Sequence, residues 1–219
     1  MKEGRIGVLL IDDHTMVLES LSARLALDPR IEVVGTAENC DDGFRLALAQ
    51  KPNVILLDVQ LPGRGSFDLA EDLASRLPET KLIFVTGYLA DVYLSQAVRL
   101  HAAGYLLKGE PVQNLANAIL RAMSGETTFS PDVMERLKFD PALKRYVLKE
   151  ETSLSTLTGR QVEVLRHLAR GESVKEIARL MHLSHKSVDS HKYRIMNKLS
   201  IHDRVELARF AIREGLLTP

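Results

Sequence analysis

Cysteine is almost absent from the sequence, with Cys40 the only one among 219 residues. A single thiol excludes an internal disulfide and any metal site built from several cysteines, as is typical of a reducing compartment. No apolar run approaches the length that spans a bilayer, and the N-terminal segment lacks the apolar core and cleavage site of a secretory signal. We therefore expect a cytoplasmic protein that does not act in a membrane.

Net charge is absent as well, because 29 Lys and Arg balance 29 Asp and Glu. The balance conceals an asymmetry along the chain. Residues 1–125 carry 12 basic and 16 acidic side chains, residues 126–151 carry 5 and 6, and residues 152–219 carry 12 and 7. The C-terminal block, with an excess of basic residues, suits a polyanionic partner, and the acidic N-terminal block does not.

Short apolar runs alternate with amphipathic stretches of helical period over the first 125 residues. The runs lie at residues 6–11, 31–35, 54–57, 82–85 and 105–107. Continuous apolar runs are typical of strands buried on both faces, so the pattern predicts a parallel sheet flanked by helices. Five strand–helix repeats fit an α/β doubly wound, five-stranded, flavodoxin-like sheet, whose ligand site lies at the carboxyl ends of the strands.

The sequence changes character after this first domain, which we expect to cover residues 1–125. Residues 126–152 contain Pro131 and Pro141 within a weak helical pattern. Because proline interrupts helices, we interpret this segment as a linker that is partly helical.

Residues 153–219 contain no strand pattern and are expected to form a small all-α domain. Four helices are indicated, and two of them begin at capping boxes, Thr158 with Gln161 and Ser173 with Glu176. Two helices joined by a tight turn in this region predict a helix-turn-helix.

Three carboxylates follow two of the predicted strands. Asp12 and Asp13 come directly after the first strand, and Asp58 ends the third. Neighbouring parallel strands end at one edge of the sheet, so these side chains are expected to converge. Close carboxylates repel one another unless a cation lies among them, and oxygen ligands suit Mg²⁺. Each residue alone is more commonly a helix cap or a strand end, but the combination favours a metal site.

Two further strand ends carry polar side chains. Thr86 ends the fourth strand and Lys108 ends the fifth. A carboxylate that attacks a phosphoryl group needs the developing charge neutralised, and a lysine, a hydroxyl donor and a divalent cation would share that work. Either residue alone is usually solvated, but their position at the edge that holds Asp58 predicts a phosphoacceptor site.

These motifs resemble the receiver domain of two-component response regulators over residues 5 to about 123. The resemblance implies phosphotransfer from the phosphohistidine of a histidine kinase to Asp58. It further implies Mg²⁺ bound by Asp13, Asp58 and the backbone carbonyl of Gln60, with Asp12 acting mostly through water. The motifs that carry the resemblance are residues 9–14 (LLIDDH), 54–63 (VILLDVQLPG), 85–87 (VTG) and 104–108 (GYLLK).

The same resemblance implies roles for the remaining strand-end residues. Lys108 and Thr86 would hold the phosphoryl oxygens, and the Thr86 hydroxyl and the Tyr105 ring would form a two-state switch. Tyr88 is a bulky side chain near the route of attacking water, which predicts a long-lived phosphorylated form. Ser66 stands where receivers usually have glycine and is expected to cap the next helix.

The second helix of the predicted helix-turn-helix covers residues 186–199. With Val188, Ile195 and Leu199 turned inward, the opposite face is polar. A solvated face is the alternative for any one of these side chains, but the helix-turn-helix spacing and the basic charge favour contacts with DNA. The candidate DNA-binding residues are Lys186, Asp189, Ser190, Lys192, Tyr193, Arg194, Asn197 and Lys198.

The C-terminal motifs resemble the LuxR-type output domain, and the whole chain resembles the NarL/FixJ class of response regulators. Gly159 stands where that family often has proline at the first helical position. The resemblance implies a transcriptional regulator rather than an enzyme, since the phosphotransfer and slow self-hydrolysis at Asp58 only control binding. The motifs are residues 157–165, 175–178, 183–184 and 188–199.

Two alternatives remain open at this stage. The helical domain could bind protein instead of DNA, which would make the chain a phosphoryl sink or adaptor; salt-dependent binding to duplex DNA would separate the two functions. The last helix could pair two copies as a homodimer on a two-fold DNA site, or its apolar side chains could pack within the domain. Those side chains are Val205, Ala208, Phe210, Ala211 and Ile212.

Overall fold

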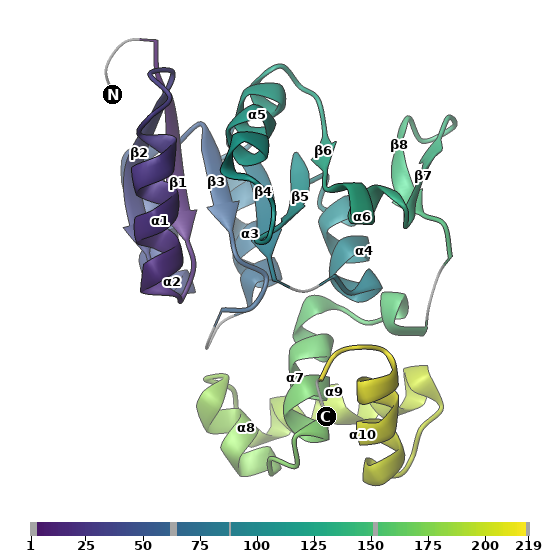
Figure 1. Ribbon diagram of the computed structural model, residues 1–219. Coiled ribbons are helices and arrows are strands. Elements are labelled where there is room, and N and C mark those ends of the chain that lie inside the picture. Colours follow the sequence, from purple (N-terminus) through teal and green to yellow (C-terminus); the bar gives the residue numbers. More distant parts are fainter. Residues whose placement is uncertain (1–3, 62–64, 88, 151–152, 218–219) are drawn as a thin grey trace.

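The computed structural model describes residues 4–61, 65–87, 89–150 and 153–217. Figure 1 shows a sheet with helices on both faces, a bundle of helices beneath it, and a small hairpin to one side. No helix in the described residues is both long enough and apolar enough to cross a membrane.

The main sheet is parallel, as the apolar runs predict. Its order is β2-β1-β3-β4-β5-β6, and the first five strands fall on the five predicted runs. The sixth strand comes from the segment that we interpreted as a linker, where Thr128 pairs with Gly104 and Phe129 with Tyr105. Two residues without an apolar run give no sequence signal, so this strand was not predicted. The strands are β1 Ile6–Ile11, β2 Ile31–Ala37, β3 Val54–Leu57, β4 Lys81–Thr86, β5 Gly104–Leu107 and β6 Thr128–Phe129.

Helices cover both faces of the sheet. Alternate residues of a strand point to opposite faces, so in β1 Leu10 packs with α1 and α5, whereas Leu9 and Ile11 pack with α2, α3 and α4. The doubly wound α/β fold is therefore confirmed. The helices are α1 Thr15–Leu25, α2 Cys40–Gln50, α3 Ser66–Arg76, α4 Asp91–Arg99 and α5 Val112–Met123.

The segment between the two domains is more ordered than its sequence indicates. After β6 come a short helix, α6 Pro131–Met134, and an antiparallel hairpin, β7 Leu137–Asp140 and β8 Arg145–Leu148. The segment thus contains a short helix, and the hairpin was not predicted. Tyr146 lies between the rings of Phe129 and Phe139, with ring centroids 5.3 and 5.5 Å apart. These contacts join the hairpin to β6 and so to the main sheet.

The C-terminal domain is all-α, as predicted. Both capping boxes are present, so the Thr158 and Ser173 side chains each accept from the backbone three residues on. The substitution of glycine for the usual proline at Gly159 does not disturb the helix start. The elements are a 3₁₀ turn η1 Ser153–Thr156 and helices α7 Gly159–Ala169, α8 Val174–Leu180, α9 His185–Leu199 and α10 Arg204–Arg213.

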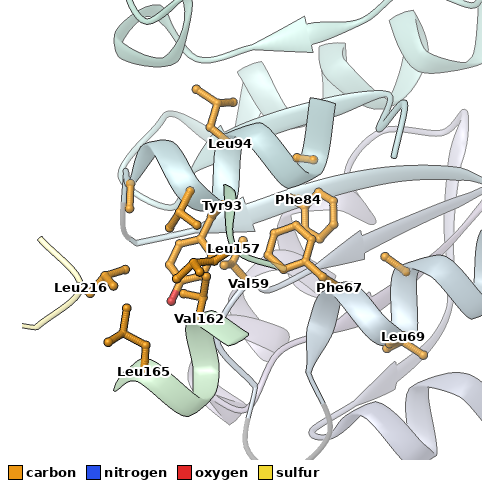
Figure 2. Close-up of a cluster of buried hydrophobic side chains, with 14 of the residues drawn as sticks. Val59, Phe67, Leu69, Phe84, Tyr93, Leu94, Leu157, Val162, Leu165 and Leu216 are labelled. Carbon is orange, nitrogen blue, oxygen red and sulfur yellow. The ribbon is translucent and has the colours of Figure 1, made fainter. Parts of the chain in front are cut away.

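An apolar seam joins the two domains, and nothing in the sequence predicted it. The first helix of the C-terminal domain, α7, packs against α3 and α4 of the sheet domain. Figure 2 shows Leu157 and Val162 packed against Tyr93, with Val59 and Phe67 beside them. These five side chains belong to one buried apolar cluster that is continuous through both domains. We call this contact the α7 seam.

Gly159 accounts for the closeness of the α7 seam. A Cβ added at this position would lie 2.9 Å from the Cβ of Phe67, closer than real Cβ atoms approach one another. It would also meet the side-chain oxygen of Gln96 in α4. A residue with no side chain at the start of α7 therefore lets the helix approach the sheet domain.

Candidate functional site

The three predicted carboxylates do converge at the carboxyl edge of the sheet. One ligand atom from each of Asp12, Asp13, His14 and Asp58 lies within 4.8 Å of all the others. Asp12 and Asp58 are 5% and 4% exposed, so their charges are held largely out of water. Hydrogen bonds orient both strand ends, since Asp58 N donates to Ile11 O and Val59 N donates to Asp58 Oδ1. A compact set of carboxylate oxygens at a partly open edge fits the ligand preference of Mg²⁺.

Lys108 bridges two of these carboxylates. Its Nζ lies 2.6 Å from Asp12 Oδ2 and 3.4 Å from Asp58 Oδ2, and its backbone N donates to Thr86 O. Burial raises the pKa of Asp58 to about 6, Lys108 opposes that shift, and Asp12 adds to it. One ammonium group therefore does not offset the burial of the carboxylates, which agrees with a site that takes a further cation.

The two expected switch residues lie behind the carboxylates. Thr86 ends β4 and Tyr105 lies on β5, and both side chains are completely buried. The Tyr105 ring lies 6.3 Å from the Phe84 ring, between centroids, and burial raises its pKa well above the ordinary value. Tyr105 is thus already turned inward. Tyr88 lies outside the described residues, so the expected long life of a phosphorylated form stays a prediction.

Ser66 does not have the expected role. It is the first residue of α3 rather than its cap, which is Gly65, and no side chain caps this helix. The Ser66 hydroxyl is buried and has no hydrogen-bond partner among the described residues. The sequence position was compatible with either place, because helix starts shift easily by one residue.

The α7 seam forms one wall of the acidic site, which sequence reasoning missed. A pocket of about 610 Å³ opens onto Asp58, Gln60 and Lys108 from the sheet domain. Gln60 Oε1 accepts a hydrogen bond of 3.3 Å from Nη2 of Arg166. The α7 residues that line the pocket are Glu163, Arg166, His167 and Arg170. Their spacing places them on one helix face, but the sequence does not show what that face meets.

Glu163 is the acidic member of this α7 face. Its Oε2 accepts from Nη1 of Arg160 at 2.8 Å, and its side chain is 20% exposed. Burial raises the pKa of Glu163 to about 7, Arg160 opposes that shift, and Asp68 adds to it. Nε of Arg160 lies 3.8 Å from Asp68 Oδ2, so an ion-pair network crosses from α7 to α3.

The candidate DNA-binding residues lie on α9, which packs against α7 and α8 within the C-terminal domain. Tyr193 is 68% exposed, and Val188 and Ile195 are buried as expected. Lys192 is half-buried. Lys198 is engaged within the domain, because its Nζ donates to Thr156 O and to Gln161 Oε1. The remaining candidates, Lys186, Asp189, Ser190, Arg194 and Asn197, are exposed.

Some apolar side chains of the last helix, α10, pack within the domain, and others are exposed and available for pairing with a second copy. Phe210 and Ala211 are buried in the core cluster, where α10 packs on α7. Val205 and Ile212 are exposed. Packing within the domain uses Phe210 and Ala211, and pairing with a second copy would use different residues of the same helix.

Two family models match the chain. Residues 8–120 match the response regulator receiver domain, and residues 155–211 match the bacterial regulatory proteins of the luxR family. The first of these covers more than half of the chain. The two matched segments coincide with the sheet domain and with the helical domain.

Several curated proteins are similar over nearly their whole length. Response regulator GacA of Pseudomonas aeruginosa is 33% identical over 213 residues, which cover 97% of this chain and 98% of GacA. Response regulator UvrY of Escherichia coli K12 is 31% identical over 211 residues, covering 96% and 95%. The uncharacterized transcriptional regulatory protein YxjL of Bacillus subtilis is 32% identical over 217 residues, covering 99% and 100%.

Solved structures share the fold. The response regulator RcsB of Salmonella typhimurium has a TM-score of 0.70 at 24% identity, over 94% of this chain and 96% of that one. RcsB has also been solved bound to a promoter in the presence of a phosphomimetic, again with a TM-score of 0.70 and 24% identity, over 94% and 98%. ChrA, the response regulator of a heme-sensing two-component system, has a TM-score of 0.52 at 28% identity, covering 98% and 100%.

Proposed function

This chain belongs to the NarL/FixJ class of two-component response regulators, and on that basis we propose that it is a transcription factor controlled by phosphorylation of Asp58. One observation carries the proposal. The buried Asp58 lies with Asp12, Asp13 and Lys108 at one edge of the sheet. Such a protein acts on genomic DNA, so we place it in the cytoplasm.

The chemistry follows from the groups around Asp58. One Asp58 oxygen attacks the phosphorus of a kinase phosphohistidine, so an O–P bond forms and the P–N bond breaks. The departing imidazole nitrogen takes up a proton. Lys108 and the Thr86 hydroxyl hold the phosphoryl oxygens, and Thr86 and Tyr105 act as the switch.

The carboxylate cluster provides the metal site in this proposal. Asp13, Asp58 and the backbone carbonyl of Gln60 would hold Mg²⁺, with Asp12 acting through water. When bound, the ion neutralises the charge that gathers on the transferred group.

The output is binding of double-stranded DNA through the exposed face of α9. The excess of basic residues in the C-terminal domain supports contacts with phosphates. The promoter-bound RcsB structure supports the same role by similarity of fold. We expect a homodimer on DNA, with Val205 and Ile212 of α10 at the contact, since both are exposed.

The experiment that tests this function is fluorescence anisotropy of the full chain on duplex DNA from upstream of its own gene. Beryllofluoride with Mg²⁺ stands in for the phosphoryl group, and Asp58→Asn is the control. We expect beryllofluoride to strengthen a salt-sensitive binding that Asp58→Asn cannot gain. Absence of binding in both states, to this DNA and to a random duplex library, would favour an adaptor that binds protein.

A further inference from the structure

The wall that α7 contributes to the acidic pocket holds Arg166, whose charge interacts with Glu163 of the same helix and whose hydrogen bond across the pocket goes to the neutral amide of Gln60. We propose that Arg166 is a phosphoryl-binding residue of the site, so that the DNA-binding domain takes part directly in recognising the phosphorylated Asp58. This inference rests on the proposed phosphorylation of Asp58. It places one residue of the phosphoryl-binding site in the C-terminal domain.

The first support is the position of Arg166. Its side chain lines the same pocket as Asp58 and Lys108, and its Nη2 donates to the side-chain amide of Gln60, two residues beyond Asp58. Arg166 also influences Tyr93 on α4, because burial raises the pKa of Tyr93 and the Arg166 charge opposes that shift. The guanidinium group thus lies between the α7 helix and the inner wall of the pocket.

The second support is the hydrogen bonding of the cations around the pocket. Lys108 already bridges Asp12 and Asp58, and Arg160 bonds Glu163. The hydrogen bond of Arg166 to Gln60 reaches a neutral amide, and its Nε is buried without a hydrogen-bond partner among the described residues. The Arg166 side chain is half-buried, and a guanidinium whose buried Nε donor is unused retains the capacity to bind an anion. Leaving that donor unpaired is unfavourable.

The third support is the chemistry that phosphorylation adds. A phosphoryl group brings nearly two negative charges and three acceptor oxygens into this pocket. The planar fork of an arginine matches such oxygens, and ion-assisted hydrogen bonds are stronger in a partly buried site than in water. Among α7 residues at the pocket, Arg166 and Arg170 outnumber the acidic Glu163, so the wall favours an anion.

The effect of phosphorylation on the α7 seam distinguishes a phosphoryl-binding role of Arg166 from a role in which α7 only obstructs the pocket. A ligand favours the state that binds it more tightly, by the ratio of its two affinities. If Arg166 binds the phosphoryl group, phosphorylation tightens the α7 seam. If α7 only obstructs the pocket, phosphorylation loosens the seam.

The test is calorimetric titration of the full chain with beryllofluoride in the presence of Mg²⁺. We expect Arg166→Gln to weaken beryllofluoride affinity about five- to tenfold and to reduce its dependence on salt, because a charged contact is lost. Arg166→Lys keeps the charge but loses the planar guanidinium. Its beryllofluoride affinity should therefore lie between those of the wild type and of Arg166→Gln. Arg179→Gln is the matched control, since Arg179 is exposed on α8 and does not line the pocket.

A second variant separates binding from seam stability. Gly159→Leu places a side chain against Phe67 and should separate α7 from the sheet domain. In that background Arg166→Gln should have no further effect on beryllofluoride affinity, as a double-mutant cycle would show. Unchanged or tighter binding by Arg166→Gln, with normal wild-type binding, would overturn the Arg166 assignment alone. Failure of the wild type to bind beryllofluoride, or equal binding by Asp58→Asn, would overturn the proposed phosphorylation and the assignment together.

Discussion

Helices α7 and α9 belong to the same small domain, yet the outer face of α7 is buried against the sheet domain and that of α9 is exposed to solvent. The side chains of α7 that face the sheet domain are buried in the α7 seam, whereas Tyr193 and its neighbours on α9 are exposed. Both helices are amphipathic and both begin with a capping residue. Their difference therefore lies in what each outer face contacts, not in how each helix is formed.

The contrast has a functional meaning. In this arrangement the receiver contacts the output domain through the α7 seam, while the residues proposed to contact DNA, except the half-buried Lys192, are exposed. Under the proposed function, phosphorylation would therefore influence DNA binding through the placement of α7 and the pairing of two copies, and not by uncovering α9. The changes considered below perturb either the α7 seam or the exposed face of α9.

The largest effect is expected from removing an apolar anchor of the seam. Leu157→Ala leaves a cavity where the fully buried Leu157 packs between the domains. Such a change costs about 2–5 kcal/mol of unfolding free energy. Urea denaturation of the full chain measures it. Leu27→Ala is the matched control, since Leu27 is 78% exposed, and an equal loss for both variants would contradict the importance of the seam.

Adding one carbon at the start of α7 should have the next largest effect. Gly159→Ala places a Cβ against Phe67, and overpacking of this kind costs about 1–3 kcal/mol even though alanine favours helices. Amide hydrogen exchange in α3, α4 and α7 should become faster. Gly109→Ala makes the same change where an added Cβ meets nothing within 4 Å. Slower exchange in Gly159→Ala than in the wild type would refute the close-packing explanation.

The stability of the α7 seam should depend on pH through the carboxyl group of Glu163. Packing of α7 against the sheet domain raises the pKa of Glu163 from 4.5 to about 7. Between these pH values the packed form holds a proton on Glu163 that a form with α7 separated from the sheet domain releases. Raising the pH through this window therefore destabilises the seam, by on the order of 1 kcal/mol per pKa unit and less because the side chain is partly exposed. The groups that face Glu163 are Arg160, Arg166 and Asp68.

The pH prediction is checked by hydrogen exchange of α7 at pH 6 and pH 8, corrected for intrinsic rates. Protection should be greater at pH 6. Glu163→Gln should remove most of the difference, because the amide does not titrate. A pH dependence that persists unchanged in Glu163→Gln would assign the effect to another group.

Short-range sequence patterns predicted the helix starts and the strands, because interactions between residues near in sequence determine these features. Capping boxes at Thr158 and Ser173 predicted two helix starts, and apolar runs predicted the strands that carry Asp58 and Lys108 to one edge. The β7–β8 hairpin has no long apolar run, and its packing is non-local, against α4 and, through Tyr146, against Phe129. The α7 seam depends on residues about 90 positions apart, such as Phe67 and Gly159, so the sequence offered no reason for a glycine at position 159.

The smallest predicted effect concerns two lysines of α9 that the sequence could not distinguish. Lys198 bonds Thr156 O and Gln161 Oε1, whereas the structure assigns Lys192 no such bond among the described residues. Lys192→Ala should therefore lower affinity for duplex DNA severalfold and reduce the slope of log affinity against log salt by about 0.9. Lys198→Ala should leave that slope unchanged and instead lower the stability of the helical domain. Anisotropy at several salt concentrations measures both variants, and a reduced slope in Lys198→Ala would show that this lysine leaves its partners to reach DNA.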